Sequence, residues 1–307
     1  MKRRPASLHL LRLPHRWPAL AAVTLCILMG AAATSGCDDT EKRMVEHLNR
    51  GTDGLARGSY LEAKAEFDKA NALVPGDADV CYYLGFLALR SGEPKDALQY
   101  LTTSAAGDPL RPQVHLGLAR AHERLGQDRE ALAALTKLFA IDPGHPNGHL
   151  LAARIARKVG DRAATNAALR AAITGDPGFV AAYLMLSHLY AEVGAWQAAR
   201  DVLSEGLRLA PDAVELQEAL GMAWLDLGRP DLAKVVYADA SKSPRASAVM
   251  HFNYASALLQ LGEGEDALGE LRRFLIVGRG TGVSEQMLKV GARMALRLRR
   301  AKQAGGG

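Results

Sequence analysis

The chain has 307 residues, of which 49% are hydrophobic and 23% are charged, so it is long and apolar enough to bury a sizeable core. Its 38 Lys and Arg residues outnumber its 33 Asp and Glu residues, but five of the basic residues lie in the first 36 positions, which contain no acid. The rest of the chain is therefore neutral in formal charge, and its composition gives no support to nucleic-acid binding.

Residues 1–36 have the organisation of an export signal. An apolar run from Trp17 to Ala33 follows a basic start and ends in small residues. The basic residues are Lys2, Arg3, Arg4, Arg12 and Arg16. A basic region, an apolar region and a small-residue boundary are typical of a cleaved signal peptide. We therefore expect residues 1–36 to be removed and to take no part in the fold.

The cysteine that follows this segment indicates a specific type of signal peptide. Thr34-Ser35-Gly36-Cys37 resembles a bacterial lipobox, in which the cysteine becomes the lipid-modified N-terminus. The resemblance implies a protein anchored by a lipid on Cys37 to a membrane of the bacterial cell envelope and facing the periplasm, and it leaves open whether that membrane is the inner or the outer one. Two alternatives remain. The signal could be cleaved after Ala33, or it could stay as an uncleaved membrane anchor, because its 17 apolar residues approach the length that spans a bilayer.

The segment after the cysteine is short, and the cysteines are few. Residues 37–43 are predicted to be the lipid attachment site and a tether, which would span about 20 to 25 Å if extended. Cys26 lies in the signal and Cys37 is expected to be acylated, so Cys81 has no cysteine left to pair with. We expect no disulfide, and a buried, unreactive Cys81.

From Met44 to Thr281 one glycine recurs every 34 residues. The series is Gly58, Gly92, Gly126, Gly160, Gly194, Gly228 and Gly262. A small residue follows each glycine five positions later, at Ala63, Ala97, Ala131, Thr165, Ala199, Ala233 and Ala267. Each glycine lies between two helical patterns, where a helix ends most easily in a left-handed residue. A period of this length is typical of a solenoid of helix–turn–helix units.

These positions resemble the tetratricopeptide repeat (TPR) family. The residues that carry the resemblance in the second repeat are Leu84, Gly85, Ala88, Gly92, Ala97 and Pro109, and in the fifth Tyr183, Leu186, Tyr190, Gly194, Trp196, Ala199 and Pro211. The resemblance implies an all-α, right-handed solenoid of about seven 34-residue repeats over residues 44–281. Residues 282–307 are then expected to form a basic capping helix and a disordered glycine tail. An alternative role for that helix is contact with anionic lipid or an acidic partner.

In the TPR family the first helix of each repeat lines a concave, partner-binding face. The predicted groove begins with apolar residues (Tyr82, Phe86, Leu89), continues with basic residues (Arg90, Arg120, Arg124, Arg154, Arg157, Lys158) and ends with acidic residues (Glu192, Glu215, Glu218). This change of sign predicts a polar partner segment that is bound in one direction. The alternative is a solvated face that binds nothing.

The sequence offers no arrangement for catalysis or metal binding. His47, His115, His149 and His251 share the fourth position of their repeats, but successive repeats lie at least ~10 Å apart, whereas ligands bond to zinc at about 2 Å. No Ser/His/Asp or Cys/His arrangement can be nominated. We therefore expect no enzyme activity, no cofactor, no metal site and no small-molecule substrate.

The expected function follows from the two resemblances together. The chain is similar to bacterial TPR lipoproteins that help to build pili or secretion pores, which implies a non-catalytic assembly scaffold with protein partners in the envelope. An adaptor for cell-wall (peptidoglycan) enzymes is the alternative.

Overall fold

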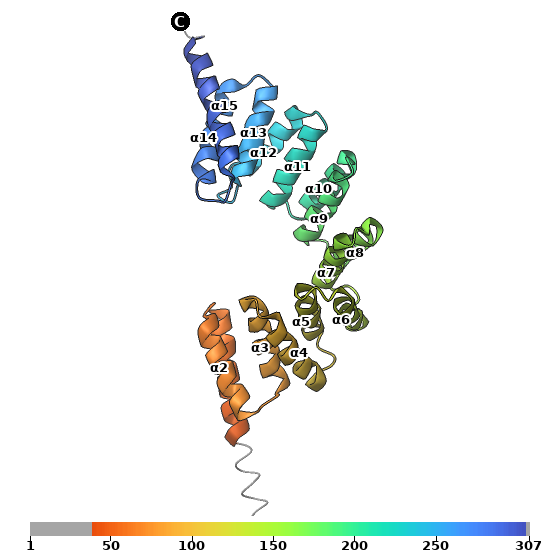
Figure 1. Ribbon diagram of the computed structural model, residues 1–307. Coiled ribbons are helices and arrows are strands. Elements are labelled where there is room, and N and C mark those ends of the chain that lie inside the picture. The colour runs from red at the N-terminus through yellow and green to blue at the C-terminus, as the bar shows by residue number, and fades with distance from the viewer. Residues whose placement is uncertain (1–38, 305–307) are drawn as a thin grey trace, which may run out of the picture. The chain divides into compact units, whose positions relative to one another are not determined.

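The computed structural model of the protein describes residues 39–304. The predicted signal peptide, Cys37 and the predicted glycine tail at residues 305–307 lie outside the described residues. The chain divides into two compact units, Met1–Pro109 and Leu110–Gly307. Within residues 39–304 every regular element is a helix, which confirms the predicted all-α fold (Figure 1).

The described part of the first unit, residues 39–109, contains two helical pairs. The helix over residues 39–56 precedes α2 (Tyr60–Leu73), and α3 (Ala78–Ser91) packs against α4 (Pro94–Gly107) and against α2. Its core consists of Met44, Ala63, Phe67, Ala70, Val80, Leu84 and Leu87. These residues come from three helices, so neither pair buries its apolar face alone.

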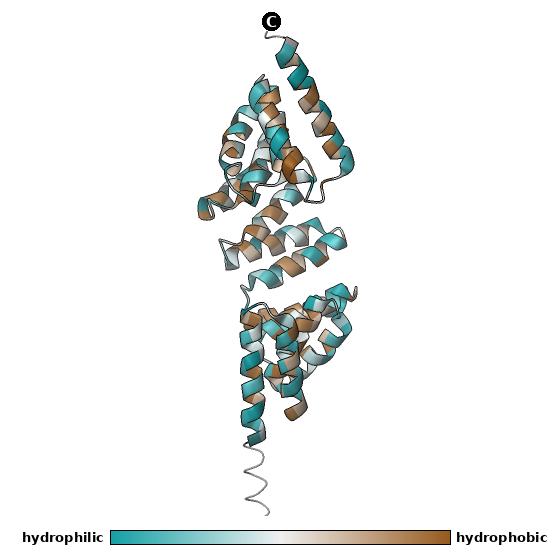
Figure 2. Ribbon diagram, turned by 90° about the vertical axis from the view of Figure 1, so that its left-hand side faces the viewer, coloured by the Kyte–Doolittle hydropathy of each residue, from teal (hydrophilic) through white to brown (hydrophobic). Residues whose placement is uncertain are grey.

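Residues 110–304 of the second unit form five helical pairs and a final helix. Its helices are α5 (Pro112–Arg124), α6 (Asp128–Ile141), α7 (Pro146–Lys158), α8 (Arg162–Gly175), α9 (Val180–Ala191), α10 (Trp196–Leu209), α11 (Val214–Asp226), α12 (Pro230–Ala240), α13 (Ala248–Gln260), α14 (Gly264–Gly278) and α15 (Glu285–Ala304). Each odd-numbered helix from α5 to α13 pairs with the helix that follows it, and α15 packs against α14. Most helices carry both polar and apolar residues (Figure 2), as expected of helices that bury one face.

The structure confirms the glycine frame. All seven glycines of the 34-residue series have φ between 68° and 80°. Gly92, for example, ends α3 with φ 80° and ψ 25°, and its N–H donates to the carbonyl oxygens of Ala88 and Leu89. This left-handed conformation strains any residue that has a Cβ. The period in the sequence therefore marks the turn inside each helical pair.

The small residues that follow the glycines by five positions are buried in the second helices. Six of the seven have no exposed surface and Ala199 is 2% exposed. The first helices contribute matching small residues that the sequence analysis did not identify. A Cβ placed on Gly221 would lie 2.4 Å from Cε1 of Tyr237, and one placed on Gly51 would lie 2.4 Å from Cε1 of Phe67. The large ring of one helix thus lies directly against the backbone of its partner helix.

Residues 39–43, which belong to the predicted tether, are helical and not extended. These residues belong to the helix that continues to residue 56. Asp39 and Glu41 lie near its N-terminal end, where negative charge interacts favourably with the helix dipole. A helix rises only about 1.5 Å per residue, so this segment reaches less than half as far as an extended chain. Within residues 39–304 no helix is long and apolar enough to cross a membrane.

The histidines at the fourth repeat position have separate partners. Nδ1 of His47 lies 2.7 Å from Oε2 of Glu66, and Nδ1 of His251 lies 2.7 Å from Oε2 of Glu270. Nε2 of His149 donates to the carbonyl oxygen of Pro143 at 2.8 Å. Among residues 39–304 no group of three or more His, Cys, Asp or Glu side chains could hold a metal ion.

The carboxylate of Glu66 forms hydrogen bonds with the side chains of Lys69 and His47. Lys69 donates to its Oε1 at 2.6 Å and His47 lies on its Oε2. The hydrogen bonds from Lys69 and His47 lower the pKa of Glu66 from 4.5 to about 2. Because the folded-state pKa is depressed, the stabilisation from this carboxylate is complete above about pH 4.5 and is lost as the pH falls toward 2.

Replacing Gly221 tests the close contact inside a repeat. Gly221→Ala should lower the free energy of unfolding by about 1 to 3 kcal/mol, because Tyr237 must move to admit the methyl group. Gly269→Ala on α14 is the control, since nothing lies within 4 Å of the Cβ it adds, and it should stabilise the chain by up to about 1 kcal/mol. Urea denaturation followed by circular dichroism measures both. Equal stability of the two variants would contradict the contact.

Removing the lysine tests the environment of Glu66. Lys69→Met should raise the pKa of Glu66 toward 4.5 and make the loss of stability at acid pH shallower. Lys64→Met is the control, because Lys64 pairs with Asp68 instead, and it should leave the pKa of Glu66 unchanged. A carboxyl-carbon NMR titration measures this pKa. A value still near 2 in Lys69→Met would show that the lysine is not its main cause.

Candidate functional site

The predicted groove residues divide between the two units. Tyr82, Phe86, Leu89 and Arg90 lie on α3 of the first unit, and the other eight lie in the second. Phe86 is 37% exposed and Tyr82 is half-buried. The guanidinium of Arg90 lies 3.9 Å from the ring centroid of Tyr60 on α2, which is cation–π geometry.

One of these four predictions is wrong. Leu89 is only 8% exposed and belongs to the core. Helix α3 packs against both α2 and α4, so its last turns are apolar around most of their circumference. The repeat position of Leu89 favoured the groove, but its side chain is buried. Phe86 and Tyr82 remain the candidate apolar contacts of the first unit.

In the second unit, basic side chains surround an open hollow of about 460 Å³. It is lined by Glu123 of α5, Arg154, Arg157 and Lys158 of α7, and Met185 of α9. Arg154 donates to Oε1 of Glu123 at 2.6 Å. Arg157 is exposed and makes no ion pair within the described part of the chain. Its guanidinium is therefore the cation in this hollow that is available to an incoming carboxylate.

Three further basic residues of the predicted groove lie on α5 and α7. Arg120 and Arg124 are exposed on α5. Lys158 donates to both oxygens of Asp128 on α6, at 3.0 and 2.8 Å. The ion pairs of Arg154 and Lys158 cross from the third repeat to the fourth, so part of the basic charge holds neighbouring repeats together. Exposed ion pairs of this kind are weak, and a partner can compete for them.

A second hollow, of about 180 Å³, lies beside the acidic end of the predicted groove. Its lining residues are Leu184 and His188 of α9, Glu215, Glu218, Ala219 and Met222 of α11, and Val249, Met250 and Asn253 of α13. Met222 is 37% exposed and Val249 is 44% exposed. The first helices of repeats five to seven supply four residues of this hollow that were not predicted, which are Leu184, His188, Met222 and Val249. The charge pattern of the sequence does not single out these residues, whereas their place in the 34-residue repeat does.

The three acidic residues of the prediction differ in what they contact. Glu192 is exposed just beyond α9, and Oε1 of exposed Glu215 lies 3.8 Å from Nη1 of Arg245. Glu218 instead accepts hydrogen bonds from the backbone N–H of Ser247 at 2.7 Å and from its hydroxyl at 2.9 Å. Ser247 is the N-cap of α13, so Glu218 fixes the start of the next helical pair.

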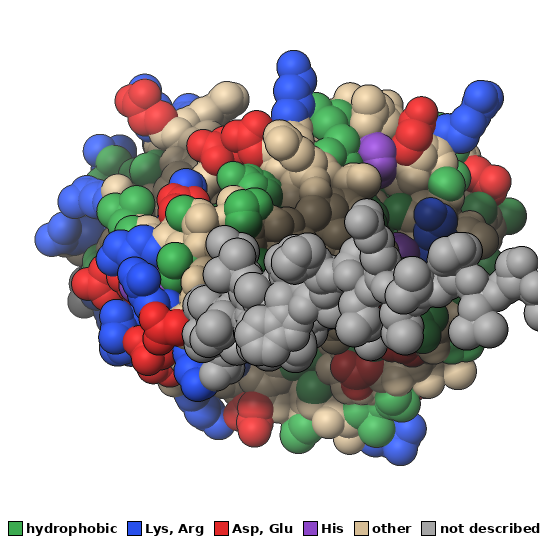
Figure 3. Space-filling view, turned by 90° about the horizontal axis from the view of Figure 1, so that it is seen from below, with side chains coloured by type: hydrophobic (Ala, Val, Ile, Leu, Met, Phe, Trp, Pro, Cys, Tyr) green, Lys and Arg blue, Asp and Glu red, His purple; other side chains and the backbone are tan. Residues whose placement is uncertain are grey.

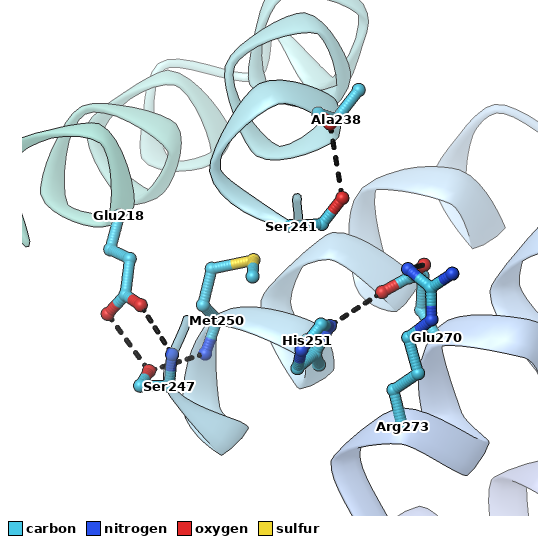
Figure 4. Close-up of polar contacts among 8 residues, drawn as sticks. All are labelled: Glu218, Ala238, Ser241, Ser247, Met250, His251, Glu270 and Arg273. Atoms are coloured by element: carbon cyan, nitrogen blue, oxygen red, sulfur yellow. Dashed lines mark hydrogen bonds and ion pairs between the residues drawn. The ribbon is translucent and has the colours of Figure 1, made fainter. Parts of the chain in front are cut away.

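Charged side chains on much of the surface lie next to charges of opposite sign. On the face shown in Figure 3, acidic and basic side chains are interspersed, with apolar side chains between them. The polar contacts at the start of α13 are drawn in Figure 4, where Glu218 reaches Ser247 and His251 faces Glu270. Arg273 also donates to Glu270, at 3.0 Å. The contacts among His251, Glu270 and Arg273 lie inside the pair formed by α13 and α14, and these residues line neither hollow.

Comparison with known proteins agrees with this architecture. Two family models, both described as tetratricopeptide repeat, match residues 88–155 and 149–276. A tetratricopeptide repeat protein from Parabacteroides merdae ATCC 43184 is 15% identical with a TM-score of 0.57, covering 83% of this chain and 99% of that one. The pilF protein of Pseudomonas aeruginosa is 15% identical with a TM-score of 0.57, covering 73% of this chain and 99% of that one. None of the curated proteins compared with the chain matches it.

At these identities the structural likeness shows the fold. The TPR fold is typically a non-catalytic scaffold for protein–protein interaction, and its chemistry depends on the surface that the repeats present. The family models, the 34-residue frame of left-handed glycines and the helical pairs agree with one another. The chain belongs to the tetratricopeptide repeat family.

Proposed function

We propose that this protein is a non-catalytic scaffold that is anchored to a bacterial envelope membrane by a lipid on Cys37 and helps to assemble a pilus or a secretion pore. The TPR repeats support the scaffold role, and the lipobox-like residues at the end of the predicted signal support the anchor. An adaptor for cell-wall enzymes remains the alternative within the same class, and the identity of the partner distinguishes the two.

The observation that carries the scaffold role is the first-helix surface of the second unit. We define this surface as the two hollows described above, the basic one on α5, α7 and α9 and the apolar one on α9, α11 and α13. The hollows share α9, so one extended segment can cross both. Arg157 presents an unpaired cation in the first hollow, and Met222 and Val249 present exposed apolar area in the second.

The two hollows favour a partner segment that carries both a carboxylate and an apolar side chain. A carboxylate of the segment pairs with Arg157, and an apolar side chain enters the hollow beside Met222 and Val249. Glu192 and Glu215 favour a basic residue toward the same end of the surface. Because the basic and apolar sites lie on successive helices, the segment binds in one direction.

The charged and apolar contacts contribute differently to binding. Exposed charges mainly raise the association rate, and salt screens them over about 10 Å. A desolvated apolar contact mainly slows dissociation, and a central one contributes roughly 2 kcal/mol or more. Kinetics can therefore separate the roles of the two hollows.

Replacing the lipobox cysteine tests the anchor. Cys37→Ala should release the protein from the membrane fraction or stall its processing, because no thiol remains to be acylated. Cys81→Ala is the control, because Cys81 is buried and 2% exposed, and it should stay with the membranes. Cell fractionation and mass spectrometry of the mature N-terminus measure the outcome. An unmodified N-terminus at Thr34 would refute lipidation.

Reversing the unpaired arginine tests the charged hollow. Arg157→Glu, alone and together with Arg154→Glu, should slow association with an envelope partner by about tenfold and reduce its dependence on salt. Arg129→Glu with Arg162→Glu is the control for the double variant, since both residues are exposed on second helices, α6 and α8, and line neither hollow. The partner is captured from envelope extract, and its binding kinetics are then measured at two ionic strengths.

The same measurement tests the apolar hollow. Met222→Ala with Val249→Ala should mainly speed dissociation, by about tenfold or more. Val235→Ala is the control, because Val235 is 67% exposed on α12 and lies outside both hollows. Circular dichroism confirms that each variant is folded. If the variants in both hollows bind the same partner with unchanged kinetics, the first-helix surface of the second unit is not the binding site.

A further inference from the structure

The final helix, α15, has an apolar face that is already occupied. Met294, Ala295 and Leu298 pack against a cluster formed by α13 and α14. Gly291 lies so close to α14 that a Cβ on it would be 2.4 Å from Cε1 of Phe274. The helix therefore completes the core of the last repeat, and this face has no room for another partner.

The opposite face of α15 carries a row of basic side chains. Lys289, Arg293, Arg297 and Arg300 follow one another at intervals of four, four and three residues, and all four are exposed. At about 100° per residue these intervals place the four side chains on one face, along roughly 16 Å of helix. We call these four residues the α15 basic row.

The α15 basic row is short of counterions. Lys289 lies 2.8 Å from Glu285. Within residues 39–304, Arg293, Arg297 and Arg300 have no acidic partner, and the side chain of Arg293 donates only to the carbonyl oxygen of Lys289, at 3.3 Å. Other exposed bases of the second unit, such as Arg154 and Lys158, do have such partners. Like charges one turn apart destabilise a helix, so the row has a cost that packing of the other face offsets.

We infer that the α15 basic row binds an acidic segment of another protein, whose carboxylates are spaced one helical turn apart. Three of the four bases are arginines, and a guanidinium can bind a carboxylate through two parallel hydrogen bonds. Glutamates at i, i+4 and i+7 of a partner helix have the same spacing as Arg293, Arg297 and Arg300. This site is separate from the first-helix surface of the second unit and does not depend on it.

The packing of α15 favours an acidic protein segment over a lipid surface. A helix that lies in a membrane interface inserts its apolar face among the lipid chains. The apolar face of α15 is packed against α14 instead. On the outer side of the helix, Leu296 is a large apolar residue that is exposed, at 48%. The row therefore offers charge and hydrogen-bond donors with little apolar area.

A designed peptide tests the inference on the full chain. The probe is a labelled helical peptide with glutamates at i, i+4 and i+7 on one face, and its control has the same composition with the glutamates dispersed around the helix. In fluorescence anisotropy the matched peptide should bind about tenfold more tightly than the dispersed one, and its binding should weaken as salt rises.

Charge-reversal variants locate the binding. Arg293→Glu with Arg297→Glu and Arg300→Glu should abolish binding of the matched peptide, whereas Arg129→Glu with Arg162→Glu and Arg208→Glu should retain it. Both sets change the formal charge equally, and all six arginines are exposed. Should the first set unfold, replacing the same three arginines with Lys keeps the charge, and should still weaken binding because the two-pronged hydrogen bonds are lost.

Three results would overturn the inference. They are equal binding of the matched and dispersed peptides, equal loss in the two charge-reversal sets, and the absence of peptide binding. Flotation with phosphatidylcholine vesicles, with and without phosphatidylglycerol, adds a further test. Recruitment by the anionic vesicles that the α15 variant loses, without peptide binding, would assign the row to lipid. Arg157→Glu should leave peptide binding unchanged, which separates this site from the proposed scaffold surface.

Discussion

The two helices of each repeat approach each other closely because small residues face large ones at the contact. The ring of Tyr237 lies against the backbone at Gly221, the ring of Phe67 lies against Gly51, and the small residue of each second helix is almost completely buried. Such contacts tolerate neither a void nor an added methyl group without cost. They set the orientation of each first helix, and therefore the direction in which its groove positions point. The left-handed glycine between the helices makes this contact possible, since it turns the chain sharply without strain.

The same period governs the contacts between repeats. Arg154 bonds Glu123 across 31 residues, Lys234 bonds Glu263 across 29, and Ser247 bonds Glu218 across 29. Each pair joins one repeat of the second unit to the next, at a separation close to the repeat length. Charged groups that the sequence places on a binding face thus also hold neighbouring repeats in register. A partner of the first-helix surface of the second unit meets a surface whose shape is already fixed, which lowers the entropic cost of binding.

The fold could be predicted from the sequence because one 34-residue period is kept by several kinds of residue at once. The glycines, the buried small residues and the final helix after the last repeat lie where the 34-residue frame places them. The candidate site was predicted less well. The position of a residue in the 34-residue repeat indicates the face of the helix on which it lies, but it does not indicate whether a neighbouring helix buries that residue. Leu89 is therefore buried, and Glu218 caps the next helical pair. The apolar hollow beside Met222 was missed for a related reason, since it is formed by three helices from three repeats.

We propose that the first-helix surface of the second unit holds a protein partner in the cell. Site-specific photocrosslinking tests it directly, with a photoreactive residue at His188 in the apolar hollow or at Ile276, which is 75% exposed on α14 and outside both hollows. The probe at His188 should form a crosslink to one defined envelope protein, which mass spectrometry identifies, and the probe at Ile276 should not. The same set of weak crosslinks from both positions would contradict the claim, because it would show that no partner occupies the surface.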